Sequence, residues 1–178
     1  MGKICIVHYH LNPGGVTRIV ESQIRCLREQ DGAREIIVLT GHCDNPEIIT
    51  SMGVKLVVEE LLNYLKEDAS KLESKFVQIQ SLLLKYIGRG DIIHFHNMNL
   101  GKNPLLTIAV SQMAKDGYFV VNHAHDFAED RETNFNFLRR IIQNEFGMEL
   151  REIMYPNLLN YLFATLNSAD QKRLFSYG

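Results

Sequence analysis

Short apolar runs alternate along the chain with longer segments in which apolar residues recur every three or four positions. Short apolar runs bounded by polar or turn residues predict strands, and the longer spacing predicts helices that bury one face. We expect strands at residues 4–8, 35–40, 54–59, 91–96, 119–123 and 161–166. Helices are expected at residues 16–28, 70–87, 104–116, 135–143 and 168–178. This alternation favours an α/β fold, a Rossmann-like doubly wound parallel sheet.

Several residues mark the limits of these helices. Pro104 lies in the first turn of one helix, where the N–H that proline lacks would have no partner. Gly88 and Gly117 follow the expected ends of two others. Ser168 is expected to cap the N-terminus of the last helix, which would end at Gly178.

Three expected strands, at residues 4–8, 91–96 and 119–123, are apolar almost throughout. Parallel strands that are buried on both faces have this composition, so we expect these three at the centre of the sheet. Ligands of such sheets bind at the carboxyl ends of the strands. The unusual polar residues of the sequence follow the same three strands, which directs the search for a site to that edge.

The first polar loop joins the first strand to its helix and contains Gly14 and Gly15. Adjacent glycines let the backbone approach a ligand closely, and a helix N-terminus offers unpaired N–H groups to an anion. The pair is therefore typical either of phosphate contact or of a tight turn that needs glycine. The loop has neither the G-x-G-x-x-G pattern nor a P-loop lysine, which counts against an ordinary nucleotide-cofactor site.

The second polar loop follows the strand at 91–96. His94 and His96 fall on the same face of that strand, because side chains alternate with a period of two. We expect His94 to be a satisfied histidine inside the sheet. The residues farther along could bind a polyhydroxylated ligand: His96, Asn97, Asn99 and Lys102.

The third polar loop follows the strand at 119–123, where His123 and His125 leave the sheet. A histidine here could donate a hydrogen bond to a sugar hydroxyl or stabilise developing charge. Glu129 and Asp130 are explained by a simpler role, since acids complement the N-terminus of a following helix. That role does not explain His125.

A metal site is an alternative reading of the pairs His94/His96 and His123/His125, with Asp126 close by. A metallo-hydrolase barrel needs about 250 residues, more than this chain has. We also expect His94 to point into the sheet, away from the other candidates. The sequence therefore predicts no metal.

Composition narrows the class of protein further. The chain has 178 residues, of which 46% are hydrophobic and 22% charged, as in one soluble domain. The formal charge is −2 and lysine and arginine are scattered, so a nucleic-acid function is disfavoured. No apolar stretch approaches the roughly 20 residues of a transmembrane helix, and the apolar run at residues 4–7 is too short for a signal peptide. Cys5, Cys26 and Cys43 form no CxxC pair and are expected to be reduced thiols of a cytoplasmic protein.

Taken together, the sequence resembles the N-terminal domain of a retaining glycosyltransferase of the GT4-like group, which has the two-domain GT-B fold. The resemblance covers essentially the whole chain. It rests on Gly14 and Gly15 at the first helix and on three stretches in the family's order: DIIHFHN at 91–97, VVNHAHDF at 120–127 and ATLNSAD at 164–170.

The resemblance implies a reaction and a set of roles. A sugar would pass from a nucleotide-diphosphate sugar, a substrate and not a cofactor, to an acceptor hydroxyl with retention, the leaving phosphate taking up the proton. Gly14 and Gly15 would lie near the donor phosphates or the acceptor, and His125 near the donor sugar at the reaction centre. The acceptor side would be formed by His96, Asn97, Asn99, Lys102, Asp126 and Arg131.

Residues 1–178 would then be a single acceptor-side domain, with a C-terminal donor-binding domain outside this chain. Catalysis requires closure of both domains over the substrates, so the chain alone is expected to be inactive. Two alternatives remain open: half of a nucleotide-sugar epimerase or phosphorylase, with His123 and Asp126 as acid/base groups, and a stand-alone flavodoxin-like binding module. A half-enzyme should expose an apolar patch where its second domain docks, and a stand-alone module should not.

Overall fold

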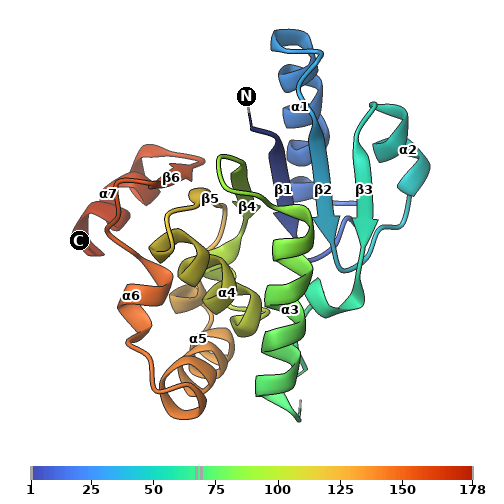
Figure 1. Ribbon diagram of the computed structural model, residues 1–178. Helices are drawn as coiled ribbons and strands as arrows, with labels where there is room; N and C mark the ends of the chain where they lie inside the picture. Colours follow the sequence, from blue (N-terminus) through green and yellow to red (C-terminus); the bar gives the residue numbers. More distant parts are fainter. Residues whose placement is uncertain (1, 67, 69, 178) are drawn as a thin grey trace.

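The computed structural model describes residues 2–66, 68 and 70–177 and has a six-stranded, entirely parallel sheet at its centre (Figure 1). The strand order is β3-β2-β1-β4-β5-β6, the order of a doubly wound Rossmann-like fold. The strands are β1 (Ile4–His8), β2 (Ile36–Thr40), β3 (Lys55–Val58), β4 (Ile92–His96), β5 (Phe119–Ala124) and β6 (Tyr161–Thr165). The predicted fold class is confirmed, with β1, β4 and β5 inside the sheet.

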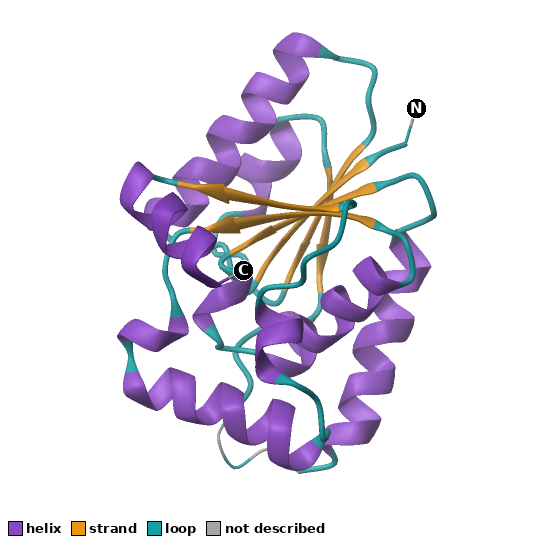
Figure 2. Cartoon of the chain, turned by 90° about the vertical axis from the view of Figure 1, so that its left-hand side faces the viewer, coloured by secondary structure: helices purple, strands orange, loops and turns teal. Residues whose placement is uncertain are grey.

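Helices lie on both sides of the twisted sheet (Figure 2). They are α1 (Gly15–Gln30), α2 (Pro46–Ser51), α3 (Leu72–Tyr86), α4 (Pro104–Lys115), α5 (Glu132–Arg139), α6 (Leu150–Met154) and α7 (Ser168–Tyr177). Alternating residues of β1 pack in opposite directions. Ile4 and Ile6 join a core with α1 and α2, whereas Cys5 and Val7 join a larger core with α3 and α4. The sheet is therefore buried on both faces at its centre.

Two helical predictions need correction, and two short helices were missed. The short helices α2 and α6 were not predicted, because five or six residues are too few to show a helical period. α5 begins at Glu132, three residues earlier than expected, and continues as a π-helix through Arg140–Glu145. Asn167, not Ser168, caps α7, since its Oδ1 accepts the N–H groups of Ala169 and Asp170, both at 2.9 Å. The expected last residue, Gly178, lies outside the described residues.

The side of the sheet that α1 covers is open toward its β6 edge. Phe119 of β5 and Leu162 of β6 are 54% and 61% exposed. Val121 pairs with Leu162, so these apolar side chains share one face with Phe119. An exposed apolar surface on neighbouring strands is typical of a surface that another element covers.

The three cysteines are free thiols, and burial raises the pKa of Cys5 to about 12. Across the part of the chain that the structure describes, none of the helices combines the length and the apolar character needed to cross a membrane.

Candidate functional site

The carboxyl ends of the central strands bring most of the histidines together. In the sheet register, Val7 lies beside Phe95 and His96 lies beside His123, so the polar residues that follow β1, β4 and β5 meet at one edge. Six of the chain's seven histidines are linked there by ring contacts. They are His8, His10, His94, His96, His123 and His125.

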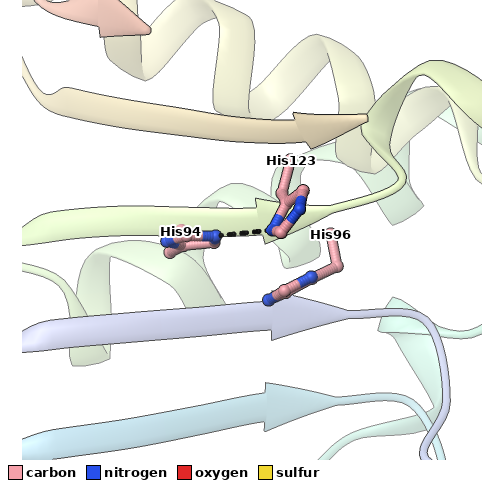
Figure 3. Close-up of side chains that lie close together, drawn as sticks. All are labelled: His94, His96 and His123. Atoms are coloured by element: carbon pink, nitrogen blue, oxygen red, sulfur yellow. Dashed lines mark hydrogen bonds between the residues drawn. The ribbon is translucent and has the colours of Figure 1, made fainter. Parts of the chain in front are cut away.

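Four of these rings lie close together. His94 and His96, two residues apart on β4, are stacked with centroids 4.8 Å apart. The His96 and His123 rings are 4.9 Å apart, and the His123 and His125 rings are stacked at 4.4 Å. Figure 3 shows the side chains of His94, His96 and His123 lying close together on the two neighbouring strands β4 and β5.

A glutamine of α1 connects the two histidines of β4. Gln23 Nε2 lies 2.8 Å from His94 Nδ1, and Gln23 Oε1 lies 2.8 Å from His96 Nε2. His94 Nε2 lies 3.3 Å from His123 Nδ1, and His96 Nδ1 lies 3.0 Å from His125 Nε2. We call these four histidines and Gln23 the histidine network.

Burial keeps the cluster uncharged at neutral pH. It lowers the pKa of His8, His94 and His125 to about 4, since the charged imidazolium loses hydration inside the protein. It also lowers the pKa of His96 and of His123. The rings are therefore neutral hydrogen-bonding groups, each with one N–H and one lone pair.

By distance alone, three of the histidines could hold a metal ion. One ring nitrogen each of His94, His96 and His123 lie within 4.8 Å of one another, and neutral imidazoles are common zinc ligands. The expectation that His94 points away from the others is wrong, because it joins them through Gln23 and His123. Its two ring nitrogens nevertheless both have partners, as expected of a satisfied histidine.

The amide of Gln23 counts against a metal on these residues. Suppose that His94 and His96 bound an ion through His94 Nε2 and His96 Nδ1, the nitrogens that do not face Gln23. The other nitrogen of each ring, which faces Gln23, would then carry a proton. The glutamine amide offers one acceptor and one donor, so one of these two protons would meet an N–H group. The observed contacts of Gln23 with His94 and His96 fit a metal-free network, and the absence of a metal stays a prediction.

The structure places two residues predicted to contact the acceptor in the interior instead. Asn97 is 3% exposed, and its Oδ1 accepts the N–H groups of His125 at 3.0 Å and Asp126 at 2.8 Å. It has a left-handed backbone, φ 66°, which asparagine tolerates better than most residues. Asn99 is fully buried and bonds Met154 O and the Asn122 amide. Both side chains hold the protein together at this edge and are not presented to a ligand.

Among the other predicted acceptor residues, His96 is also fully buried, within the histidine network. Asp126 and Arg131 form an ion pair at 3.2 Å and remain 41% and 53% exposed. Lys102 Nζ lies 5.4 Å above the ring centre of Tyr64. These three, unlike His96, are in positions from which they can reach a ligand.

Glu129 and Asp130 do not serve the N-terminus of the following helix as expected. Asp130 accepts hydrogen bonds at 2.8 Å from the Arg173 guanidinium of α7, and Glu129 accepts one at 2.7 Å from the Tyr155 hydroxyl. The guanidinium also lies 4.3 Å above the Phe127 ring. Asp130 therefore fixes the third loop to the last helix, and Glu129 fixes it to Tyr155 at the end of α6. Sequence periodicity does not reveal such pairings between distant segments.

The glycine loop, residues 12–15, needs no glycine for its own structure. Gly14 is extended, with φ 173° and ψ 179°, and a methyl group at Gly15 would meet no atom within 4 Å. The tight-turn explanation is therefore wrong. A cavity of about 500 Å³ opens here between α1 and α2, and both glycines line it with Arg18 and Asn45.

Two residues of this edge were not predicted. Gln23 lies among Ile19, Val20 and Leu27 on the apolar face of α1, and a polar residue in such a stripe is a signal that the sequence does carry. Tyr64, whose hydroxyl lies 3.0 Å from His10 Nε2, gives no such signal, because it lies in a loop after a short 3₁₀-helix.

Comparison with known proteins shows a similarity to a curated enzyme. No protein-family model matches the chain. It is 28% identical over 188 residues to mannosylglucosyl-3-phosphoglycerate synthase of Petrotoga mobilis. The similarity covers 100% of this chain and 35% of that protein, so the chain spans about a third of the relative's length. This similarity supports a relationship to a glycosyltransferase.

Proposed function

We propose that this chain is the acceptor-side domain of a retaining glycosyltransferase that uses a nucleotide-diphosphate sugar. The observation that carries the proposal is that an unobstructed helix N-terminus and a neutral, half-buried His125 both lie at the carboxyl edge of a Rossmann-like sheet. The similarity to mannosylglucosyl-3-phosphoglycerate synthase supports the same class of reaction.

The glycine loop suits the diphosphate of a sugar nucleotide or a phosphate of the acceptor. α1 begins at Gly15 with no acidic residue in its first turn, so no carboxylate in that turn offsets the partial positive charge of its N-terminus. Neither Gly14 nor Gly15 carries a side chain that would shield those N–H groups. Backbone N–H groups at a helix start bind phosphates readily.

His125 is better suited to bind a sugar hydroxyl than to transfer a proton. Its pKa of about 4 makes it a poor source of protons at neutral pH. Its backbone N–H is held by Asn97 and its ring by His96, which fixes its position. Such a rigid, neutral group orients a substrate, and in the resembled family the leaving phosphate takes up the acceptor proton.

The epimerase alternative needs His123 and Asp126 to act together. Within the described residues no hydrogen bond joins them, because His123 bonds His94, and Asp126 is held by Asn97 and Arg131. The exposed ion pair of Asp126 and Arg131 suits the acceptor side instead.

The proposal includes a second domain, which binds the donor. The exposed apolar face formed by Phe119 and Leu162 supports it, as does the much greater length of the relative. We propose that the donor is held mainly by that domain, so the 178-residue chain binds nucleotide sugars weakly and does not turn them over.

Binding of uridine, guanosine and adenosine diphosphate sugars, measured by ligand-observed NMR, tests the proposal. At least one should bind with a Kd on the order of 1 mM, about −4 kcal/mol. His125→Gln should weaken that binding by about tenfold, the effect of one hydrogen bond. His42→Gln is the control, because His42 is exposed and pairs with Asp44. Equal binding by the wild type and His125→Gln, or turnover at enzyme-like rates by the chain alone, would contradict the proposal.

A further inference from the structure

The histidine network is an unbranched chain of hydrogen bonds. It runs from His123 through His94, Gln23 and His96 to His125, with links of 3.3, 2.8, 2.8 and 3.0 Å. Four of its five members are neutral imidazoles, and each must donate with one nitrogen and accept with the other. Only the amide of Gln23 has a fixed direction, because its nitrogen donates and its oxygen accepts.

The nitrogen of Gln23 determines the protons on one side of the chain. It donates to His94 Nδ1, so His94 carries its proton on Nε2. That N–H donates to His123 Nδ1, which leaves the proton of His123 on Nε2 as well.

The oxygen of Gln23 determines the protons on the other side. It accepts from His96 Nε2, so Nδ1 of His96 is a lone pair. His125 Nε2 donates to that lone pair, and His125 Nδ1 is left without a proton. One amide therefore gives all four histidines the same tautomer, with the proton on Nε2.

We propose that Gln23 is a positioning residue that holds the four histidines in the Nε2–H tautomer, so that His123 Nε2–H and His125 Nδ1 bind two neighbouring hydroxyl groups of a carbohydrate. The ligand class rests on the proposed function, whereas the tautomers rest on the hydrogen bonds alone. Each end of the chain then has a defined character: His123 donates and His125 accepts.

The two ends are placed to act on one ligand. The His123 and His125 rings are stacked, with centroids 4.4 Å apart and planes at 26°. Both residues are partly exposed, and among the described residues the hydrogen bonds of these rings use His123 Nδ1 and His125 Nε2, which leaves His123 Nε2 and His125 Nδ1 for a ligand. A sugar hydroxyl can both donate and accept, so two adjacent hydroxyls can satisfy this pair.

Glutamine is the side chain that this arrangement requires. A carboxylate at the same position would accept from both His94 and His96. In Gln23→Glu, His94 would therefore carry its proton on Nδ1 and so would His123, while His96 and His125 would stay unchanged. The His123 end would change from a donor to an acceptor.

The test reads the tautomers directly from long-range ¹H–¹⁵N correlations of the imidazole rings, in a chelator at pH 8. The wild type should show protonated Nε2 and unprotonated Nδ1 in all four histidines. Gln23→Glu should move the proton to Nδ1 in His94 and His123 only. Gln78→Glu, the same change on the exposed face of α3, should alter none of them. Mixed tautomers in the wild type would overturn the proposal even if no variant folds.

Glucose, titrated to several hundred millimolar, tests the ligand class. The His123 Nε2 and His125 Nδ1 signals should shift, with no change of tautomer, and Gln23→Glu should weaken the response about three- to tenfold. If nucleotide sugars perturb Gly15 while glucose leaves both nitrogens unchanged, this inference fails and the proposed function stands. If neither ligand binds but the tautomers are uniform, the proposed function and the carbohydrate assignment fail together. Zinc binding that displaces Gln23 from His94 and His96 would overturn the network itself.

Discussion

The glycine loop and the histidine network lie at the same edge of the sheet. The glycine loop leaves a helix start open to a cavity, whereas the histidine network uses its polar atoms to bond the protein itself. In the glycine loop, neither the backbone conformation nor the packing calls for glycine, and the helix start faces an open cavity. In the histidine network, almost every polar atom bonds another atom of the protein.

This difference shows that a polar residue at this edge is not necessarily available to a ligand. His96, Asn97 and Asn99 are polar and lie at the expected edge, but they are buried and already partnered. Gly14 and Gly15 carry no polar side chain and leave the backbone free for a ligand. The groups at this edge that remain available to a ligand are thus those that internal hydrogen bonds leave unused.

Acidification should produce the largest effect, on the histidine network and His8. Because the pKa of His8 and His94 is about 4 in the fold and about 6.5 in the unfolded chain, the unfolded chain binds more protons between these values. The stability contributed is therefore present above pH 6.5 and lost toward pH 4. For His8, which is 4% exposed, the loss is about 1.4 kcal/mol per pH unit. Urea denaturation at pH 7, 6 and 5 checks this, and a flat profile would contradict it.

Asn97→Ala should have the next largest effect, because Asn97 holds the His125 loop. The substitution leaves the N–H groups of His125 and Asp126 without a partner and places alanine in a left-handed conformation. We expect a loss of about 2–4 kcal/mol in the free energy of unfolding. Asn97→Gly is the matched control, since it removes the same hydrogen bonds but tolerates the backbone. It should recover about 1 kcal/mol of the loss, and equal losses would show that backbone strain is absent.

Gly15→Ala should separate stability from binding in the glycine loop. A methyl group meets no atom there, and alanine favours a helix over glycine, so stability should rise by about 0.5–1 kcal/mol. Nucleotide-sugar binding should nevertheless weaken, because the methyl group occupies the space in front of the helix start. Calorimetry measures the stability of this variant, and ligand titration measures its binding of nucleotide sugars. A variant that is stabilised and binds as well as the wild type would remove this loop from the site.

Arg131→Ala should have the smallest effect on stability. Its ion pair with Asp126 is exposed, so the free energy of unfolding should change by only about 0–1 kcal/mol. If Arg131 serves the acceptor side, the substitution should instead weaken acceptor binding, measured by titration of the same variant. A large loss of stability would show that Arg131 is structural.

Much of the fold was predictable, because the regular spacing of apolar residues determines the strands and the long helices. The six strands and the long helices α1, α3 and α4 follow from their spacing. The short helices α2 and α6 do not, since their few residues depend on tertiary packing. The cap at Asn167 was missed because serine and asparagine are equally good caps and stand side by side.

The candidate site was predictable in position but not in detail. The edge follows from strand order, whereas the use of Asn97 as a clamp depends on a contact between two loops. Gln23 shows the limit most clearly. Its place in an apolar stripe indicates burial, but its partners lie about 70 residues away along the chain.

The most direct test of the proposed function is a backbone amide NMR titration of this chain with nucleotide sugars, free nucleotides, simple sugars and zinc. We expect a nucleotide-diphosphate sugar to perturb the amides of Gly14, Gly15 and His125 together, even at millimolar affinity. Tight zinc binding at His94, His96 and His123, with no response to any nucleotide sugar, would contradict it.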